Sequence, residues 1–194
     1  MLNINSVCVF CGSKNGKHPI YEESARRLGE IMAERSVSLV YGGGRIGLMG
    51  VVSDTILERG GKVVGVLPKF LKDLEVANDK VTELIITNTM HERKNLMFKI
   101  SDGFVVLPGG LGTLDEILEI LTWKQLRLHS KPVVILNVDG YWSPLSDLVN
   151  STIDGDFAHP GVKELFTMVD SVEDVFPFLV NQPNPKDDVL TSHL

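Results

Sequence analysis

The sequence predicts an α/β fold in which a doubly wound parallel sheet is flanked by helices on both faces. Two observations lead to this prediction. Short apolar runs of the β type alternate with longer amphipathic runs, which is the order of βαβ units. Val, Ile and Leu also fill successive positions of the apolar runs without alternating with polar residues, so both faces of the sheet should be covered.

The elements follow from this pattern in chain order. The apolar runs, which begin with "SVCVF", predict strands at 6–10, 36–42, 62–68, 83–87, 103–109, 132–138 and 166–170. The amphipathic runs between them predict helices at 20–35, 46–60, 90–102, 112–128, 143–152 and 172–180. Ligands of such sheets bind beyond the carboxyl ends of the strands, so the residues that follow each strand are the candidates for function.

The length of the chain and its ending set the domain organisation. A chain of 194 residues suffices for one domain with a sizeable core. We expect a single domain over 1–180 and a loosely ordered tail over 181–194, because "NQPNPKDDVLTSHL" is polar and contains prolines.

The composition argues against several partners. The net charge of −6 gives no general attraction to nucleic acid or to an anionic membrane, so we expect neither, and an anionic ligand would need a local site. No apolar run approaches the roughly 18 to 20 residues of a membrane span. The start "MLNINSVCVF" lacks the basic region of a signal peptide, so a cytoplasmic location is expected.

Cys8 and Cys11 have the C-x-x-C spacing of redox and zinc sites. Strand residues three apart point to opposite faces, which separates the two sulfur atoms too far for a disulfide unless the chain turns sharply. No second pair of ligands lies nearby for zinc, so we expect two buried thiols and no metal site.

The stretch "YGGGRIGLMG" follows the second predicted strand. Gly42, Gly44 and Gly47 match the G-x-G-x-x-G fingerprint of dinucleotide sites, but the next strand ends in "GVLPKF" without the acidic residue that would hold a ribose. A close approach of the backbone to a ligand, or simple turn chemistry, remain the alternatives.

The stretch "PGGLGTLDE" follows the fifth predicted strand. Gly109, Gly110 and Gly112 leave backbone amides unobstructed at a helix start, and Thr113 adds a hydroxyl, so this loop is expected to bind an anion. The spacing is too short for a Walker loop and the loop contains no lysine, which favours a monophosphate over a triphosphate.

Glu116 allows two interpretations. Thr113 and Glu116 fit the T-x-x-E pattern of a capping box, in which they would only cap the helix. The neighbouring Asp115 and the density of glycines are unnecessary for a cap, and a carboxylate one turn from bound phosphate could reach the sugar. The local pattern leaves both interpretations open.

"MHERKN" follows the fourth predicted strand and opens a helix. Arg93 and Lys94 lie early in this helix, where a cation opposes the helix dipole, so helix stability does not account for them. They either form a solvated face or bind an anion or a sugar, and Met90 could supply apolar surface to a base.

The predicted helix 112–128 has apolar residues around much of its circumference. Such a helix must bury a second face, which indicates either a homodimer interface beside the site or a deeply buried core helix.

Together, "YGGGRIGLMG", "MHERKN" and "PGGLGTLDE" are similar to the LOG ("Lonely guy") family of cytokinin riboside 5'-monophosphate phosphoribohydrolases, formerly labelled lysine decarboxylases. The similarity covers roughly residues 5 to 180 and includes "CGS", "TWKQL" and "KPVVILNVDGYW". One departure is visible: many members have two glutamates where this chain has Asp115 and Glu116.

The resemblance implies a Rossmann-like homodimer that hydrolyses the N-glycosidic bond of AMP, as an AMP nucleosidase, or of N6-modified (cytokinin) 5'-monophosphates, without a cofactor. It implies that Arg93 and Glu116 are catalytic. The implied substrate-binding residues are Ser13, Gly43, Gly44, Glu83, Met90, Arg93, Lys94, Gly109, Gly110, Leu111, Gly112, Thr113, Glu116 and Thr122.

Two other functions remain open at this point. The same fold could serve a non-catalytic nucleotide sensor or cofactor carrier, or a transferase that moves the ribosyl phosphate to an acceptor other than water. A pyridoxal phosphate decarboxylase is not indicated, because no Schiff-base lysine and no partner for the pyridinium ring can be identified.

Overall fold

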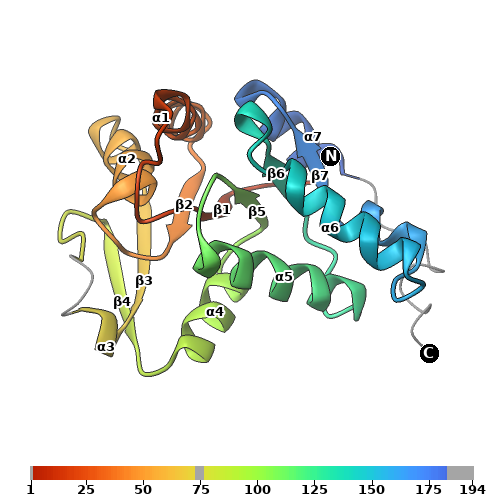
Figure 1. Ribbon diagram of the computed structural model, residues 1–194. Helices are drawn as coiled ribbons and strands as arrows, with labels where there is room; N and C mark the ends of the chain where they lie inside the picture. The colour runs from red at the N-terminus through yellow and green to blue at the C-terminus, as the bar shows by residue number, and fades with distance from the viewer. Residues whose placement is uncertain (1, 73–76, 183–194) are drawn as a thin grey trace.

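The computed structural model describes residues 2–72 and 77–182 and contains one sheet of seven parallel strands (Figure 1). Its strand order is β4-β3-β2-β1-β5-β6-β7. The strands are β1 (Ser6–Phe10), β2 (Ser38–Tyr41), β3 (Val63–Pro68), β4 (Glu83–Thr87), β5 (Gly103–Val106), β6 (Val133–Leu136) and β7 (Thr167–Val169). The predicted doubly wound parallel sheet is therefore confirmed.

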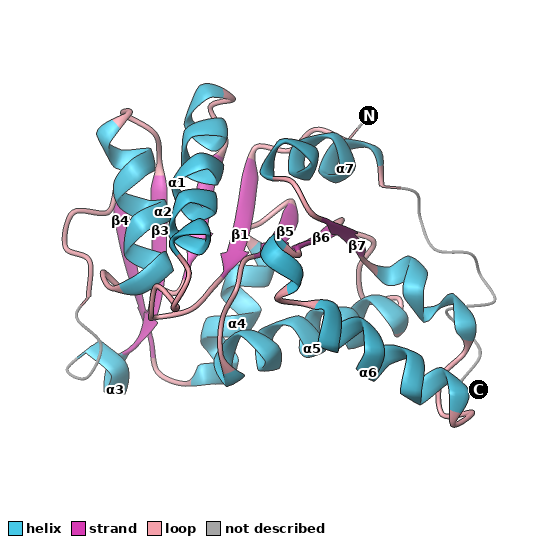
Figure 2. Cartoon of the chain, turned by 45° about the horizontal axis from the view of Figure 1, so that its top comes forward, coloured by secondary structure: helices cyan, strands magenta, loops and turns pink. Residues whose placement is uncertain are grey.

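Helices cover both faces of the sheet (Figures 1 and 2). One layer consists of α1 (Pro19–Glu34), α2 (Gly47–Glu58) and α7 (Val175–Asn181). The other consists of α4 (Met90–Lys99), α5 (Leu111–Gln125) and α6 (Ser143–Asp154). Each layer shares a separate apolar core with the sheet, as expected for strands that are apolar on both faces.

Alternate residues of β1 point into these two cores. Val7 and Val9 belong to the core under α1, whereas Cys8 and Phe10 belong to the core over α5. Cys8 and Cys11 consequently lie in different cores, and both are buried free thiols, as the spacing predicts.

The differences from the predicted elements are small. Most strands are shorter than predicted, and the predicted helix 172–180 is a 3-10 turn (Val172–Asp174) followed by α7. The short helix α3 (Lys69–Lys72) and the 3-10 segments Val138–Gly140 and Pro160–Leu165 were not predicted. Such short pieces have too few residues to show a helical periodicity in the sequence.

The described elements continue slightly past residue 180, where the sequence predicts the end of the domain. Helix α7 continues to Asn181, and the Gln182 side chain accepts a hydrogen bond from the Val133 amide (2.8 Å). The rest of the predicted tail, 183–194, lies outside the described residues.

The centre of the sheet is a topological switch point. β1 pairs with β2 on one side and with β5 on the other, so the chain leaves these two central strands in opposite directions. Backbone hydrogen bonds from Leu107 to Phe10 (2.9 Å) and from Gly12 to Pro108 (3.0 Å) hold the two strand exits together. A crevice at the carboxyl ends of such strands is the expected ligand site of this architecture.

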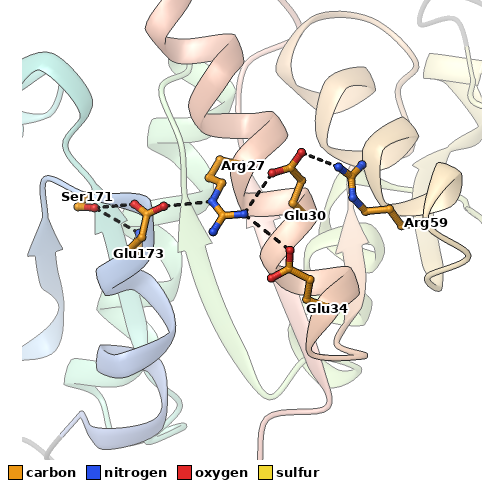
Figure 3. A network of polar contacts seen from close by, with 6 residues as sticks. All are labelled: Arg27, Glu30, Glu34, Arg59, Ser171 and Glu173. Carbon is orange, nitrogen blue, oxygen red and sulfur yellow. Dashed lines mark hydrogen bonds and ion pairs between the residues drawn. The ribbon is translucent and has the colours of Figure 1, made fainter.

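Arg27 is the centre of an exposed ion-pair network on the opposite side of α1 from the sheet (Figure 3). It contacts Glu30 and Glu34 of its own helix and Glu173 of the 3-10 turn before α7. Glu30 also pairs with Arg59 at the end of α2. The network therefore links three segments of one helical layer.

Within the described part of the chain, none of the helices combines the length and hydrophobicity that crossing a membrane requires. The cytoplasmic location stays a prediction.

Candidate active site

A cavity of about 230 Å³ opens at the switch point, on the side of α4 and α5. Five segments that are distant in the sequence form its walls: the loop after β1, α2, α4, the loop after β5 and the first half of α5. The lining residues are Cys11, Gly12, Ser13, Met49, Arg93, Gly110, Leu111, Gly112, Thr113 and Glu116.

Arg93 and Glu116 form an ion pair inside this cavity. Arg93 Nη1 lies 3.3 Å from Glu116 Oε1, and each residue is only 8% exposed. Arg93 Nε also donates a hydrogen bond to the Val66 carbonyl at 3.0 Å, which fixes the plane of the guanidinium. Removing one partner of a buried pair typically destabilises a protein by about 3–5 kcal/mol, so both charges depend on each other.

A capping interaction at the start of α4 sets the position of Arg93. The Thr89 hydroxyl accepts a hydrogen bond from the Glu92 amide (3.1 Å), and the Glu92 carboxylate accepts one from the Asn88 amide (2.8 Å). A T-x-x-E cap is therefore present in this chain, but it begins α4.

The capping interpretation of Thr113 and Glu116 is wrong. The N-cap of α5 is Gly110, without any side-chain cap, and the helix already begins at Leu111. Thr113 and Glu116 thus lie inside the helix, beyond the position that a cap occupies. The glycines allow the helix to begin early, and Glu116 is free to face Arg93.

The first turn of α5 presents polar groups to the cavity. Thr113 is 3% exposed, and it is one of the residues that line the cavity. A Cβ at Gly109 would collide with the Thr113 hydroxyl, so only glycine fits at that position. Buried hydroxyls are normally hydrogen-bonded, and one that lines a cavity is suited to a ligand.

The glycine turn after β2 packs behind Arg93. A Cβ at Gly42 would overlap the Arg93 guanidinium, whereas Gly43 has a positive φ of 80° and accepts a hydrogen bond from the Asn78 amide (3.0 Å). Gly44 pairs with Ala77. Gly43 and Gly44, predicted to bind substrate, do not line the cavity, because the segment at 77–78 occupies their polar groups.

Lys94 does not line the cavity either. Its ammonium group lies 3.1 Å from Asp115 Oδ2 and 3.1 Å from Glu119 Oε2, both on α5. Burial alone would lower the pKa of Lys94, but the hydrogen bonds to these two carboxylates outweigh it and raise the pKa. Lys94 therefore joins α4 to α5, and Asp115, unlike Glu116, faces away from the cavity.

The structure also separates three other predicted residues from the cavity. Glu83 is exposed at the first position of β4, which is the amino edge of the sheet and opposite to the site. Met90 is the first residue of α4 and is partly buried outside the lining. The Thr122 hydroxyl donates to the Leu118 carbonyl (2.7 Å), three helical turns from the glycine loop.

Sequence reasoning missed Cys11, Gly12 and Met49 as lining residues. The signal that could have found them is their position at the exits of β1 and β2. Burial first, and then the negative charge of Glu116, raise the pKa of the Cys11 thiol, so it stays protonated in the cavity. Among the described residues, no cluster of three or more His, Cys, Asp or Glu could hold a metal ion.

A second cavity of about 370 Å³ adjoins the first and shares Gly12, Ser13 and Gly110 with it. Its other walls include Lys14 and the rings of Tyr21 and Tyr141, which meet edge to face with centroids 5.5 Å apart. The Tyr141 hydroxyl donates to the Gly109 carbonyl at 2.5 Å. The glycine loop is therefore supported from this side by Tyr141.

The fold occurs in proteins of quite different sequence. A molybdenum cofactor binding protein from Rippkaea orientalis superposes with a TM-score of 0.67 at 23% identity, covering 92% of this chain and 96% of that protein. A Moco carrier protein from Chlamydomonas reinhardtii gives a TM-score of 0.68 at 23% identity, covering 99% and 100%. At this identity the likeness concerns the fold alone.

Sequence relatives are much closer. LOG7 of Arabidopsis thaliana, a cytokinin riboside 5'-monophosphate phosphoribohydrolase, is 42% identical over 97% of this chain and 86% of its own length. LOG5 of the same plant, which has the same name, is 44% identical over 87% of this chain and 74% of its own length. LOGL2 of Oryza sativa subsp. japonica, a probable enzyme of this kind, is 44% identical over 84% of this chain and 66% of its own length.

A family model described as "possible lysine decarboxylase" matches residues 49–179, which include α4 and the glycine loop after β5. With these matches and the buried Arg93–Glu116 pair, the chain belongs to the LOG family.

Proposed function

We propose that this protein hydrolyses the N-glycosidic bond of AMP, or of N6-modified adenosine 5'-monophosphates, to the free base and ribose 5-phosphate. The observation that carries the proposal is the buried pair of Arg93 and Glu116 beside an uncapped, glycine-rich helix start. The names of the relatives support this reaction, since LOG7 and LOG5 are called phosphoribohydrolases of such nucleotides.

The 5'-phosphate is proposed to bind at the first turn of α5. Free amides at a helix N-terminus favour anions, and the buried Thr113 hydroxyl offers one more donor. A phosphate held there places the attached ribose toward Glu116, which lies on the same helix and lines the same cavity.

Glu116 is proposed to act on the sugar carbon. Cleavage of a ribosyl bond builds positive charge on the sugar, which a carboxylate can stabilise while it orients the attacking water. Among the described residues that line the cavity, Glu116 is the only carboxylate, and it is mostly shielded from solvent, where electrostatic stabilisation is strongest.

Arg93 is proposed to set the geometry of Glu116 and of the ribose. A guanidinium does not give up its proton in a protein, so Arg93 is not the acid for the leaving base. Its two fixed contacts, to Val66 and Glu116, hold it rigidly, and correct positioning can lower a barrier by several kcal/mol.

We also propose a homodimer through α5 and α6. Helix α5 buries Ile117, Ile120 and Leu121 in the core, yet Leu118 on the other side is 45% exposed. Leu118, Thr122 and Leu148 line an apolar groove of about 270 Å³ between α5 and α6. A helix that is apolar on two sides needs a second partner. Light scattering at micromolar concentration tests this proposal, and a monomer would contradict it.

The decisive test of the reaction is an incubation of the purified protein with AMP and with isopentenyladenosine monophosphate, followed by chromatography. We expect free base from at least one of them. Tight nucleotide binding without any release of base over hours would instead identify a binding protein. Transfer of the ribosyl phosphate to another acceptor would release free base without forming ribose 5-phosphate.

A further inference from the structure

The charges of the proposed site do not balance once a nucleotide is bound. A 5'-monophosphate brings close to two negative charges at neutral pH, and the chain as a whole is already acidic, with a net charge of −6. Amides and a hydroxyl bind a phosphate but leave its charge uncompensated. A cation should therefore lie near the start of α5.

The two cations that the sequence suggests for this purpose are both committed elsewhere. Arg93 is paired with Glu116, and Lys94 is held between Asp115 and Glu119. In each case the positive charge is already neutralised by a carboxylate of α5. Neither is free to become the counter-charge of a phosphate without breaking an existing pair.

Lys14 is a different kind of cation. It lines the larger cavity, which meets the smaller one at Gly12, Ser13 and Gly110, the N-cap of α5. Lys14 makes no ion pair with any residue that the structure describes. Arg93 and Lys14 are the two cations among the described residues that line the cavities, and the charge of Lys14 is the one not already compensated.

The loop that carries Lys14 is firmly held. A Cβ at Gly47, at the start of α2, would collide with the backbone between Ser13 and Lys14, and the Gly12 carbonyl accepts a hydrogen bond from the Met49 amide (3.4 Å). The backbone of Lys14 consequently has a fixed position beside the glycine loop, and only its side chain has to move toward a ligand.

We propose that Lys14 is the cation that recognises the 5'-phosphate of the substrate and makes the protein select nucleotides over nucleosides. The phosphate lies where the two cavities meet, between the first turn of α5 and Lys14, and the ribose lies beside Glu116. This inference rests on the proposed function for its substrate, but phosphate recognition by Lys14 can be measured without turnover.

The first experiment is a calorimetric titration with ribose 5-phosphate, which contains the phosphate and cannot be hydrolysed at a glycosidic bond. We expect Lys14→Ala to weaken binding about tenfold, the usual effect of losing one charge-assisted contact. Lys14→Arg should retain most of the affinity. Lys17→Ala is the matched control, because Lys17 is an exposed lysine of the same loop that lines neither cavity. The affinity of this variant for ribose 5-phosphate should equal that of the wild type.

The second experiment measures release of base from AMP and from adenosine. Lys14→Ala should raise KM for AMP about tenfold with little change in kcat, and the difference from the wild type should shrink at high ionic strength, because salt screens an exposed charge. Activity on adenosine should be the same in both proteins.

The outcomes separate the two proposals. Unchanged affinity of Lys14→Ala for ribose 5-phosphate, or no binding of this sugar by the wild type, overturns the role of Lys14. Absence of base release from every protein overturns the hydrolase, while the titration still decides whether Lys14 holds the phosphate.

Discussion

The two halves of α5 each bury a charged residue, but one charge faces a counter-ion and the other faces a neutral amide. Glu116, near the start, faces the guanidinium of Arg93. Lys124, near the end, is 1% exposed, and the partner of its ammonium group is the neutral amide oxygen of Gln182 at 3.4 Å. Burial lowers the pKa of Lys124 to about 8. A buried group with a counter-ion can stay ionised and take part in chemistry, whereas a buried charge without a counter-ion lowers the free energy of unfolding.

The surroundings of Lys124 are those of a structural site. The Gln182 side chain that receives it also accepts from the Val133 amide (2.8 Å) and donates to the Thr167 hydroxyl (3.2 Å), so it closes the edge of β6 and β7. The surroundings of Glu116 are those of a binding site, because Glu116 lines a cavity together with the buried Thr113. If this contrast is correct, substitutions at the two ends should affect different properties.

The largest effect is expected for Glu116→Gln. Losing the carboxylate should lower kcat for base release from AMP at least about 100-fold, because the amide cannot stabilise positive charge on the sugar. Steady-state kinetics together with circular dichroism of the folded variant provide the measurement. A variant that keeps wild-type kcat would remove Glu116 from the proposed mechanism.

Gly42→Ala should come next. The added methyl group would overlap the Arg93 guanidinium and displace it, so we expect a fall in kcat on the order of 100-fold while the protein stays folded. The control is Gly155→Ala at the end of α6, where the added methyl group would meet the exposed Phe157 ring (3.1 Å) and the Ser151 carbonyl oxygen (3.2 Å) but no residue of the cavity. Equal activity of the two variants would show that the glycine turn does not position Arg93.

Lys124→Met should stabilise the protein and leave its activity unchanged. The unfolded chain keeps the Lys124 proton up to a pKa near 10.5, but the folded chain releases it above about 8, so the stability of the wild type rises with pH between these values. The variant lacks this penalty and should gain on the order of 2 kcal/mol near pH 7. Urea unfolding at pH 7 and pH 10 should show the advantage shrinking at the higher pH, and a destabilised variant would contradict the assignment.

The smallest effect is expected for the exposed network of Arg27. Arg27→Ala removes the contacts to Glu30, Glu34 and Glu173 that are drawn in Figure 3, yet exposed ion pairs contribute little to stability because solvent screens them. We expect only a small decrease in the temperature of thermal unfolding, and a smaller one at high salt. A decrease as large as that caused by breaking a buried pair would contradict this expectation.

The order of elements could be predicted from the sequence because it depends on local periodicity. Strands that are apolar on both faces require two helical layers, and these are present. The neighbours of each strand could not be predicted in the same way, since the pairing of Val7 with Gly103 joins residues that are remote in the chain. The switch point was therefore expected only in general terms.

The candidate site was predicted unevenly for similar reasons. Arg93, Glu116 and the loop from Gly110 to Thr113 follow strand exits, and the structure brings them to one cavity. The position of Lys94 outside the cavity could not be predicted, because its carboxylate partners lie on another helix, which no local pattern reveals. The position of Glu83 at the amino edge of the sheet could have been predicted, because it lies at the beginning of a predicted strand.

The strand order has a consequence for synthesis of the chain. β1 is made first, and β2, β3 and β4 add to one of its sides in succession, whereas β5, β6 and β7 add later to the other. Until residue 106 has left the ribosome, one side of β1 has unpaired backbone groups. The nascent protein therefore exposes an aggregation-prone strand edge during about half of its translation. Helix α5, which contains Glu116, is synthesised only after β5 has paired with this edge.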